Sequence, residues 1–173
     1  MRRTHELLVN HINAVRSLPL LGSTTAVMIL ESNLAFESQH LLHALGEAGV
    51  KKWIALSEGQ GGSIGLLTTH ARKEEYTLLL REALRIGKIS FHEQFTSVSL
   101  GSQAAKVRLK DELLNFSIVT QPPTTMFGKV RKTFTGKLGG KQDDLVLALQ
   151  MSIYGSKMFW QEKKYATYRV NTH

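Results

Sequence analysis

Acidic residues that could bind a metal ion occur at two places far apart in the sequence. Two of the three aspartates, Asp143 and Asp144, are adjacent, and Glu31 directly follows an apolar run over residues 26–30. Hard divalent cations prefer clustered carboxylate oxygens. Two Mg²⁺ or Mn²⁺ ions about 4 Å apart can hydrolyse a phosphodiester, one activating water and the other stabilising the leaving oxygen. The three acids therefore predict a two-metal catalytic site formed by Glu31, Asp143 and Asp144.

A structural role for the same acids is the alternative. Asp143 would cap a helix, Asp144 would interact with the positive end of the helix dipole, and Glu31 would end a strand in solvent. Neighbouring helical residues are about 100° apart, so the two aspartates are not expected to point in the same direction. The pattern leaves open which of them is the primary ligand.

The charge balance favours nucleic acid as a partner. The chain carries 22 Lys and Arg against 14 Asp and Glu, a net charge of +8, and such an excess favours contacts with a phosphate backbone. Phosphate contacts discriminate little between bases, which suits a nuclease that cuts with low base specificity. The candidate DNA-binding residues are Lys73, Lys129, Arg131, Lys132, Lys137 and Lys141.

Length and composition narrow the class of protein. A chain of 173 residues fits one domain, and the absence of Cys excludes disulfides, thiolate zinc sites, iron–sulfur clusters and a cysteine nucleophile. The longest apolar run near the N-terminus is far shorter than the roughly 20 residues that span a bilayer. The sequence predicts an intracellular, non-secreted protein without a membrane partner.

Hydrophobic periodicity predicts an α/β protein. A helix–strand order with a βαβ unit is expected in the first half, in which the strand before Glu31 is a buried central strand. The segment 161–173 is expected to be a frayed tail. Helices are predicted over residues 4–18, 35–48, 69–87 and 143–160, and around residues 111–114 within the segment 103–116. Strands are predicted over 26–30 and 52–56, and a short strand or extended segment over 88–95.

Three segments, in this order, resemble the C-terminal nuclease domain of herpesvirus-type terminase large subunits. Residues 29–38, ILESNLAFES, are similar to the family's strand-to-helix segment of the form VEGNSSQDS, matching at Glu31, Asn33 and Ser38 with Ser32 in place of glycine. Residues 71–95 resemble the lysine-bearing helix and the basic turn after it. Residues 134–154, FTGKLGGKQDDLVLALQMSIY, resemble the family's YSGK, linker, DDL and apolar helix.

The resemblance implies a ribonuclease H-like mixed sheet flanked by helices and endonucleolytic cleavage of concatemeric viral DNA with two Mg²⁺ or Mn²⁺. It also implies double-stranded DNA, other terminase subunits and the capsid portal as partners, and the host nucleus as location. The family's aspartate directly before the apolar helix is a ligand, which favours Asp144. The DDL pattern also occurs in phage terminases and Holliday-junction resolvases, so a resolvase is an alternative. A non-catalytic DNA-binding or assembly module with the same fold is another.

One departure from the family concerns the first catalytic aspartate. The family takes it from the opening strand, whereas residues 1–30 contain no Asp, and Glu6 falls on a predicted helix. The chain also has no Walker A motif for the terminase motor. Residues 1–173 are therefore expected to form a single, partial nuclease domain that lacks its opening strand or strands and is inactive or weakly active alone.

Overall fold

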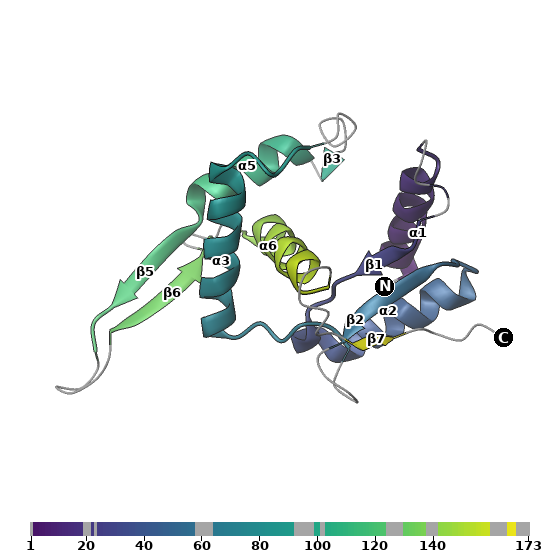
Figure 1. The fold of residues 1–173 in the computed structure, drawn as a ribbon, viewed down its shortest axis with the longest axis horizontal. Coiled ribbons are helices and arrows are strands. Elements are labelled where there is room, and N and C mark those ends of the chain that lie inside the picture. The colour runs from purple at the N-terminus through teal and green to yellow at the C-terminus, as the bar shows by residue number, and fades with distance from the viewer. Residues whose placement is uncertain are drawn as a thin grey trace. The chain divides into compact units, whose positions relative to one another are not determined.

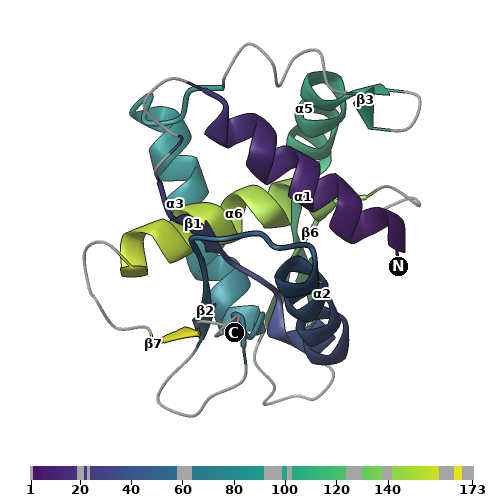
Figure 2. The same cartoon turned by 90° about the vertical axis from the view of Figure 1, so that its right-hand side faces the viewer.

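The computed structural model describes residues 2–18, 22, 24–57, 64–91, 99–100, 103–123, 130–137, 142–159 and 166–168. It confirms a mixed α/β protein with both parallel and antiparallel strand pairs. The chain forms two compact units, Met1–Thr68 with Lys157–His173, and Thr69–Ser156. Their helices and strands are labelled in Figure 1 and seen from a second direction in Figure 2.

The first unit contains a three-stranded sheet of order β1-β2-β7, in which β1 and β2 are parallel and β2 and β7 are antiparallel. Helix α2 connects the two parallel strands, which confirms the predicted βαβ unit. The elements are α1 (Arg2–Arg16), β1 (Ala26–Met28), the 3₁₀ turn η1 (Ser32–Leu34), α2 (Ala35–Glu47), β2 (Trp53–Ser57) and β7 (Ala166–Tyr168).

Two features of this sheet differ from expectation. Strand β1 lies at an edge of the sheet formed by the described residues, and only Met28 of its three residues is buried, so it is not a buried central strand. Residues 166–168, within the segment expected to be frayed, form β7. The apolar run that suggested a buried strand is instead shared between β1 and the residues leading to Glu31.

The core of the first unit lies between α1, α2 and the sheet. Ile12 of α1, Leu42 and Leu45 of α2, and Met28 and Ala55 of the sheet belong to one buried cluster. The helical spacing of the apolar residues in α1 and α2 places them on the face that the sheet covers. This packing positions the end of β1, where Glu31 follows.

The second unit packs helices against a β-hairpin. Its elements are α3 (His70–Arg85), β3 (Ser99–Leu100), β4 (Gln103–Ala104), α5 (Ala105–Asn115), β5 (Ser117–Gln121), β6 (Arg131–Thr135) and α6 (Asp144–Lys157). Strands β5 and β6 are antiparallel, and the hairpin extends away from α3 and α5 (Figure 1). The predicted helices are confirmed here. Residues 88–91 have no regular secondary structure, and the rest of the segment 88–95, predicted as a short strand or extended segment, lies outside the described residues.

The core of this unit joins the three helices. Leu80 of α3, Leu109 of α5 and Val146 of α6 form one buried cluster. The rings of Tyr76 and Tyr154 pack with centroids 4.7 Å apart at 54°. Helix α6 is therefore fixed along its length by side chains of α3 and α5, and its first turn has a defined position within the unit.

Candidate functional site

Asp143 lies directly before α6, which begins at Asp144. Its backbone carbonyl accepts a hydrogen bond from Leu147 N at 2.9 Å. Its buried carboxylate accepts hydrogen bonds through Oδ2 from Gly136 N at 3.0 Å and from Thr135 Oγ1 at 3.4 Å. The turn between β6 and α6 therefore holds this carboxylate in one orientation.

Gly136 permits this close approach. A Cβ at this position would lie 2.9 Å from Asp143 Cβ, closer than such atoms pack. The absence of a side chain at Gly136 lets its N–H reach the carboxylate. The glycine in the FTGK segment is thus explained by the position of Asp143.

The two aspartates converge on one cation. Lys137 Nζ lies 3.5 Å from Asp143 Oδ1 and 4.0 Å from Asp144 Oδ1. Asp143 precedes α6, so the 100° spacing of helical residues does not apply to it. Lys137 and Asp144 are 63% and 62% exposed, whereas the Asp143 side chain is 5% exposed. The pair therefore combines one fixed, buried carboxylate with one that faces solvent.

Glu112 is a second buried acid at the start of α6, and the sequence did not single it out. Its Oε2 accepts hydrogen bonds from Leu145 N at 2.7 Å and Val146 N at 3.2 Å. A carboxylate at this end of a helix satisfies free N–H groups and complements the helix dipole. Glu112 thus fixes the first turn of α6 from α5.

Arg108 balances the charge of Glu112. Its Nε donates to Glu112 Oε1 at 3.0 Å, and its Nη2 donates to Gln142 Oε1 at 2.6 Å and lies 3.9 Å from Asp144 Oδ2. The only sequence signal was the spacing of Arg108 and Glu112, four residues apart on one helix. That spacing indicates a local ion pair and carries no information about a contact with α6.

Glu31 follows β1 in the first unit, as predicted. It forms an isolated parallel bridge with Leu66, and Ser32 N donates to Leu66 O at 3.0 Å. Its half-buried side chain accepts a hydrogen bond at Oε1 from Asn33 Nδ2, 3.1 Å away. Glu31 therefore lies at the carboxyl end of a parallel strand, next to the start of a helical segment.

Glu31 belongs to the first unit, and Asp143 and Asp144 belong to the second. Their meeting in space stays a prediction. Among the described residues, no group of three His, Asp or Glu side chains is arranged to hold a metal ion. Among the described residues of the second unit, Asp143 and Asp144 are the acids whose carboxylate oxygens lie within 4.0 Å of Lys137 Nζ.

The candidate DNA-binding residues are distributed over the second unit. Lys73 is half-buried on α3, Lys132 is exposed on β6, and Lys137 lies beside the aspartates. Arg131 begins β6. Lys129 and Lys141 lie outside the described residues.

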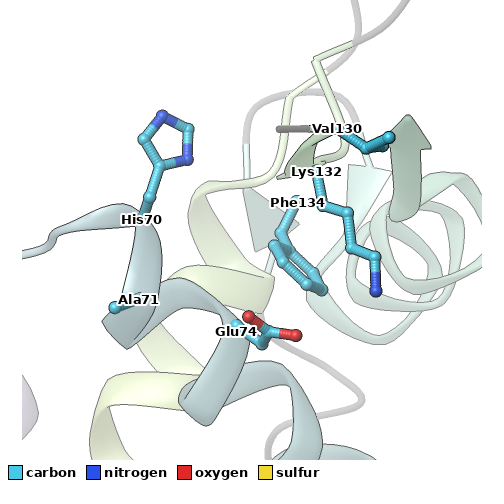
Figure 3. A pocket seen from close by; sticks show the side chains of 6 residues that line it. All are labelled: His70, Ala71, Glu74, Val130, Lys132 and Phe134. Atoms are coloured by element: carbon cyan, nitrogen blue, oxygen red, sulfur yellow. The ribbon is translucent and has the colours of Figure 1, made fainter. Parts of the chain in front are cut away.

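A pocket of about 350 Å³ lies where the start of α3 faces β6. Figure 3 shows His70, Ala71 and Glu74 on the helix, and Val130, Lys132 and Phe134 on or beside the strand. Both a carboxylate and an ammonium line the pocket, and Phe134 is buried. The pocket therefore does not select ligands of one charge.

The fold and the turn between β6 and α6 define a mixed α/β protein with a lysine-bridged aspartate pair at the start of a buried helix. Comparison with protein-family models, curated proteins and solved structures finds no significant match. None of the helices in the described ranges combines the length and apolar character needed to cross a bilayer.

Proposed function

We propose that this chain is the nuclease portion of a viral DNA-packaging terminase, with a ribonuclease H-like fold and metal-dependent cleavage of double-stranded DNA. The observation that supports it best is the convergence of Asp143 Oδ1 and Asp144 Oδ1 on one cationic nitrogen. A place where two carboxylates already hold a positive charge suits a divalent cation. The terminase assignment rests on the order of the three similar segments, ending in DDL before the buried α6.

The donor set fits Mg²⁺ or Mn²⁺. Mg²⁺ is usually bound by one or two carboxylates, with water and substrate phosphates completing its coordination. Asp143 Oδ2 is held by Gly136 N, which fixes the plane of this carboxylate, and Asp144 is exposed and free to adjust. A bound ion would activate water and polarise the phosphoryl group. A second ion would require Glu31.

The surrounding residues would position this site and the DNA. Glu112 and Arg108 hold the first turn of α6, so the aspartates start from a defined geometry. The exposed Lys132 on β6 supplies a phosphate contact in the same unit. Such contacts bind the backbone without reading the bases, which suits cleavage at many sequences.

Metal-dependent stabilisation of the full chain tests the proposal. Mn²⁺ is expected to raise the melting temperature of the wild type, because a ligand that binds only the folded state stabilises it. Asp144→Asn is expected to remove most of this rise, whereas Asp111→Asn, the same change at the exposed third aspartate, leaves it intact. A fusion that restores an upstream strand with its aspartate is expected to nick DNA in Mn²⁺, and full activity of this fusion in both Glu31→Ala and Asp144→Ala would exclude the assignment.

A non-catalytic DNA-binding module is the second candidate. It is favoured by the contact of Asp143 with the Gly136 N–H and by the capping of α6 by Glu112, which give both buried acids a structural role. It predicts salt-sensitive DNA binding that needs no divalent ion and survives Asp144→Asn. Absence of any Mn²⁺ effect on melting, together with such binding, would select this candidate.

A further inference from the structure

We propose that Lys137 occupies the metal position in the free protein and that DNA releases it. A DNA phosphate takes the Lys137 ammonium, and a divalent cation replaces it between Asp143 and Asp144. This inference rests on the proposed function and adds a regulation of the same site. Metal binding and DNA binding are thereby coupled through one side chain.

The position of the Lys137 ammonium opposes metal binding by the two aspartates. Lys137 Nζ lies within 4.0 Å of an oxygen of each aspartate, so an ion bound by the same two oxygens would be next to it. Two cations at such a separation repel one another. Asp143 is almost fully buried, and a buried carboxylate needs a positive partner. Lys137 supplies that charge while no metal is bound.

The Lys137 ammonium can move away from the aspartates, whereas the Arg108 guanidinium is held in place. The Lys137 backbone N donates to Thr135 Oγ1 at 3.0 Å, while its ammonium ends a flexible stem that is 63% exposed. The Arg108 guanidinium is held by Glu112 and Gln142 and is 27% exposed. A phosphate is the other anion that a lysine ammonium binds well. DNA arriving at this face therefore competes with the aspartates for Lys137.

The exchange has a thermodynamic consequence. If DNA removes a competitor of the metal, DNA tightens metal binding, and the metal tightens DNA binding by the same factor. A phosphate that coordinates the metal directly would also couple the two ligands. Only the coupling that passes through Lys137 disappears when this ammonium is removed, so a variant at this position separates the two sources.

The test is a Mn²⁺ titration of the full chain followed by electron paramagnetic resonance of the free ion, with and without a short DNA duplex. Lys137→Gln is expected to bind Mn²⁺ about thirtyfold more tightly than the wild type without DNA, since a unit charge about 4 Å from a doubly charged ion contributes ~2 kcal/mol at a solvated site. The effect of DNA on Mn²⁺ affinity falls by a similar factor. Lys137→Arg keeps the charge and is expected to retain the weaker wild-type affinity.

The controls distinguish failure of this inference from failure of the proposed function. Lys110→Gln removes an exposed ammonium on α5 and is expected to leave Mn²⁺ affinity unchanged. If Asp144→Asn abolishes Mn²⁺ binding but Lys137→Gln binds no more tightly than the wild type, the role of Lys137 is overturned and the metal site stands. If the wild type and Lys137→Gln bind no Mn²⁺ with or without DNA, both proposals are overturned.

Discussion

Replacing Glu112 by alanine is expected to destabilise the second unit by about 2–4 kcal/mol. The carboxylate is 5% exposed and accepts hydrogen bonds from Leu145 N, Val146 N and Arg108 Nε. Loss of a helix-capping side chain costs about 1 kcal/mol, and loss of a hydrogen bond to a charged group costs about 1.5–3 kcal/mol. Arg108 is 27% exposed and keeps Gln142 as a partner, which limits the total.

Urea denaturation followed by circular dichroism measures the free energy of unfolding, and amide hydrogen exchange locates the effect. The Leu145 and Val146 amides are expected to lose protection first, because Glu112 accepts from both. Glu112→Gln keeps an acceptor oxygen and is expected to lose about half as much stability. Asp111→Ala, an exposed acid on the same helix, is expected to change stability by less than about 0.5 kcal/mol. Unchanged stability and unchanged protection in Glu112→Ala would refute the capping role.

Three further predictions concern backbone positions and a buried tyrosine. Gly65→Ala is expected to cost about 2 kcal/mol or more, because φ is +99° and a Cβ would lie 2.6 Å from Leu30 O; Gly49→Ala, at φ +68° with open space, should lower the melting temperature less. Gly136→Ala is expected to weaken Mn²⁺ binding about tenfold, because a Cβ would push against Asp143; a calorimetric titration showing wild-type affinity would contradict this. Burial raises the pKa of Tyr76 from 10.0 to about 12, so the unfolded chain loses this proton first and the stability due to the neutral phenol is lost as pH rises from 10 to 12. Tyr76→Phe should flatten that part of a stability–pH curve, and an unchanged curve would count against the buried phenol.

Local patterns were sufficient to predict the helices and the βαβ unit. The helix predicted over residues 69–87 forms as α3, and its inner residues Tyr76 and Leu80 are buried. The apolar run before Glu31 and the turn residues around Gly49 indicated strand, helix and strand in that order. These features depend on residues that are close in sequence, and hydrophobic periodicity reflects such local relationships.

Contacts between distant residues could not be predicted from such patterns. Glu112 caps a helix that begins more than thirty positions later, and its spacing to Arg108 accounts only for the local pair. Strand β7 is three residues long and is defined by its pairing with β2. The sequence placed Asp143 and Asp144 in one site but not their contact with Lys137, because the turn that brings this ammonium back to the start of α6 leaves no periodic signal.

The most direct test of the metal site is anomalous diffraction from crystals of the full chain grown with Mn²⁺ and a short DNA duplex. We predict an anomalous peak bound by Asp143 Oδ1 and Asp144 Oδ1 at about 2.1 Å, the distance typical of Mg²⁺, with the Lys137 ammonium on a DNA phosphate. A structure in which Lys137 still bridges the two aspartates and Mn²⁺ is bound elsewhere would contradict the account.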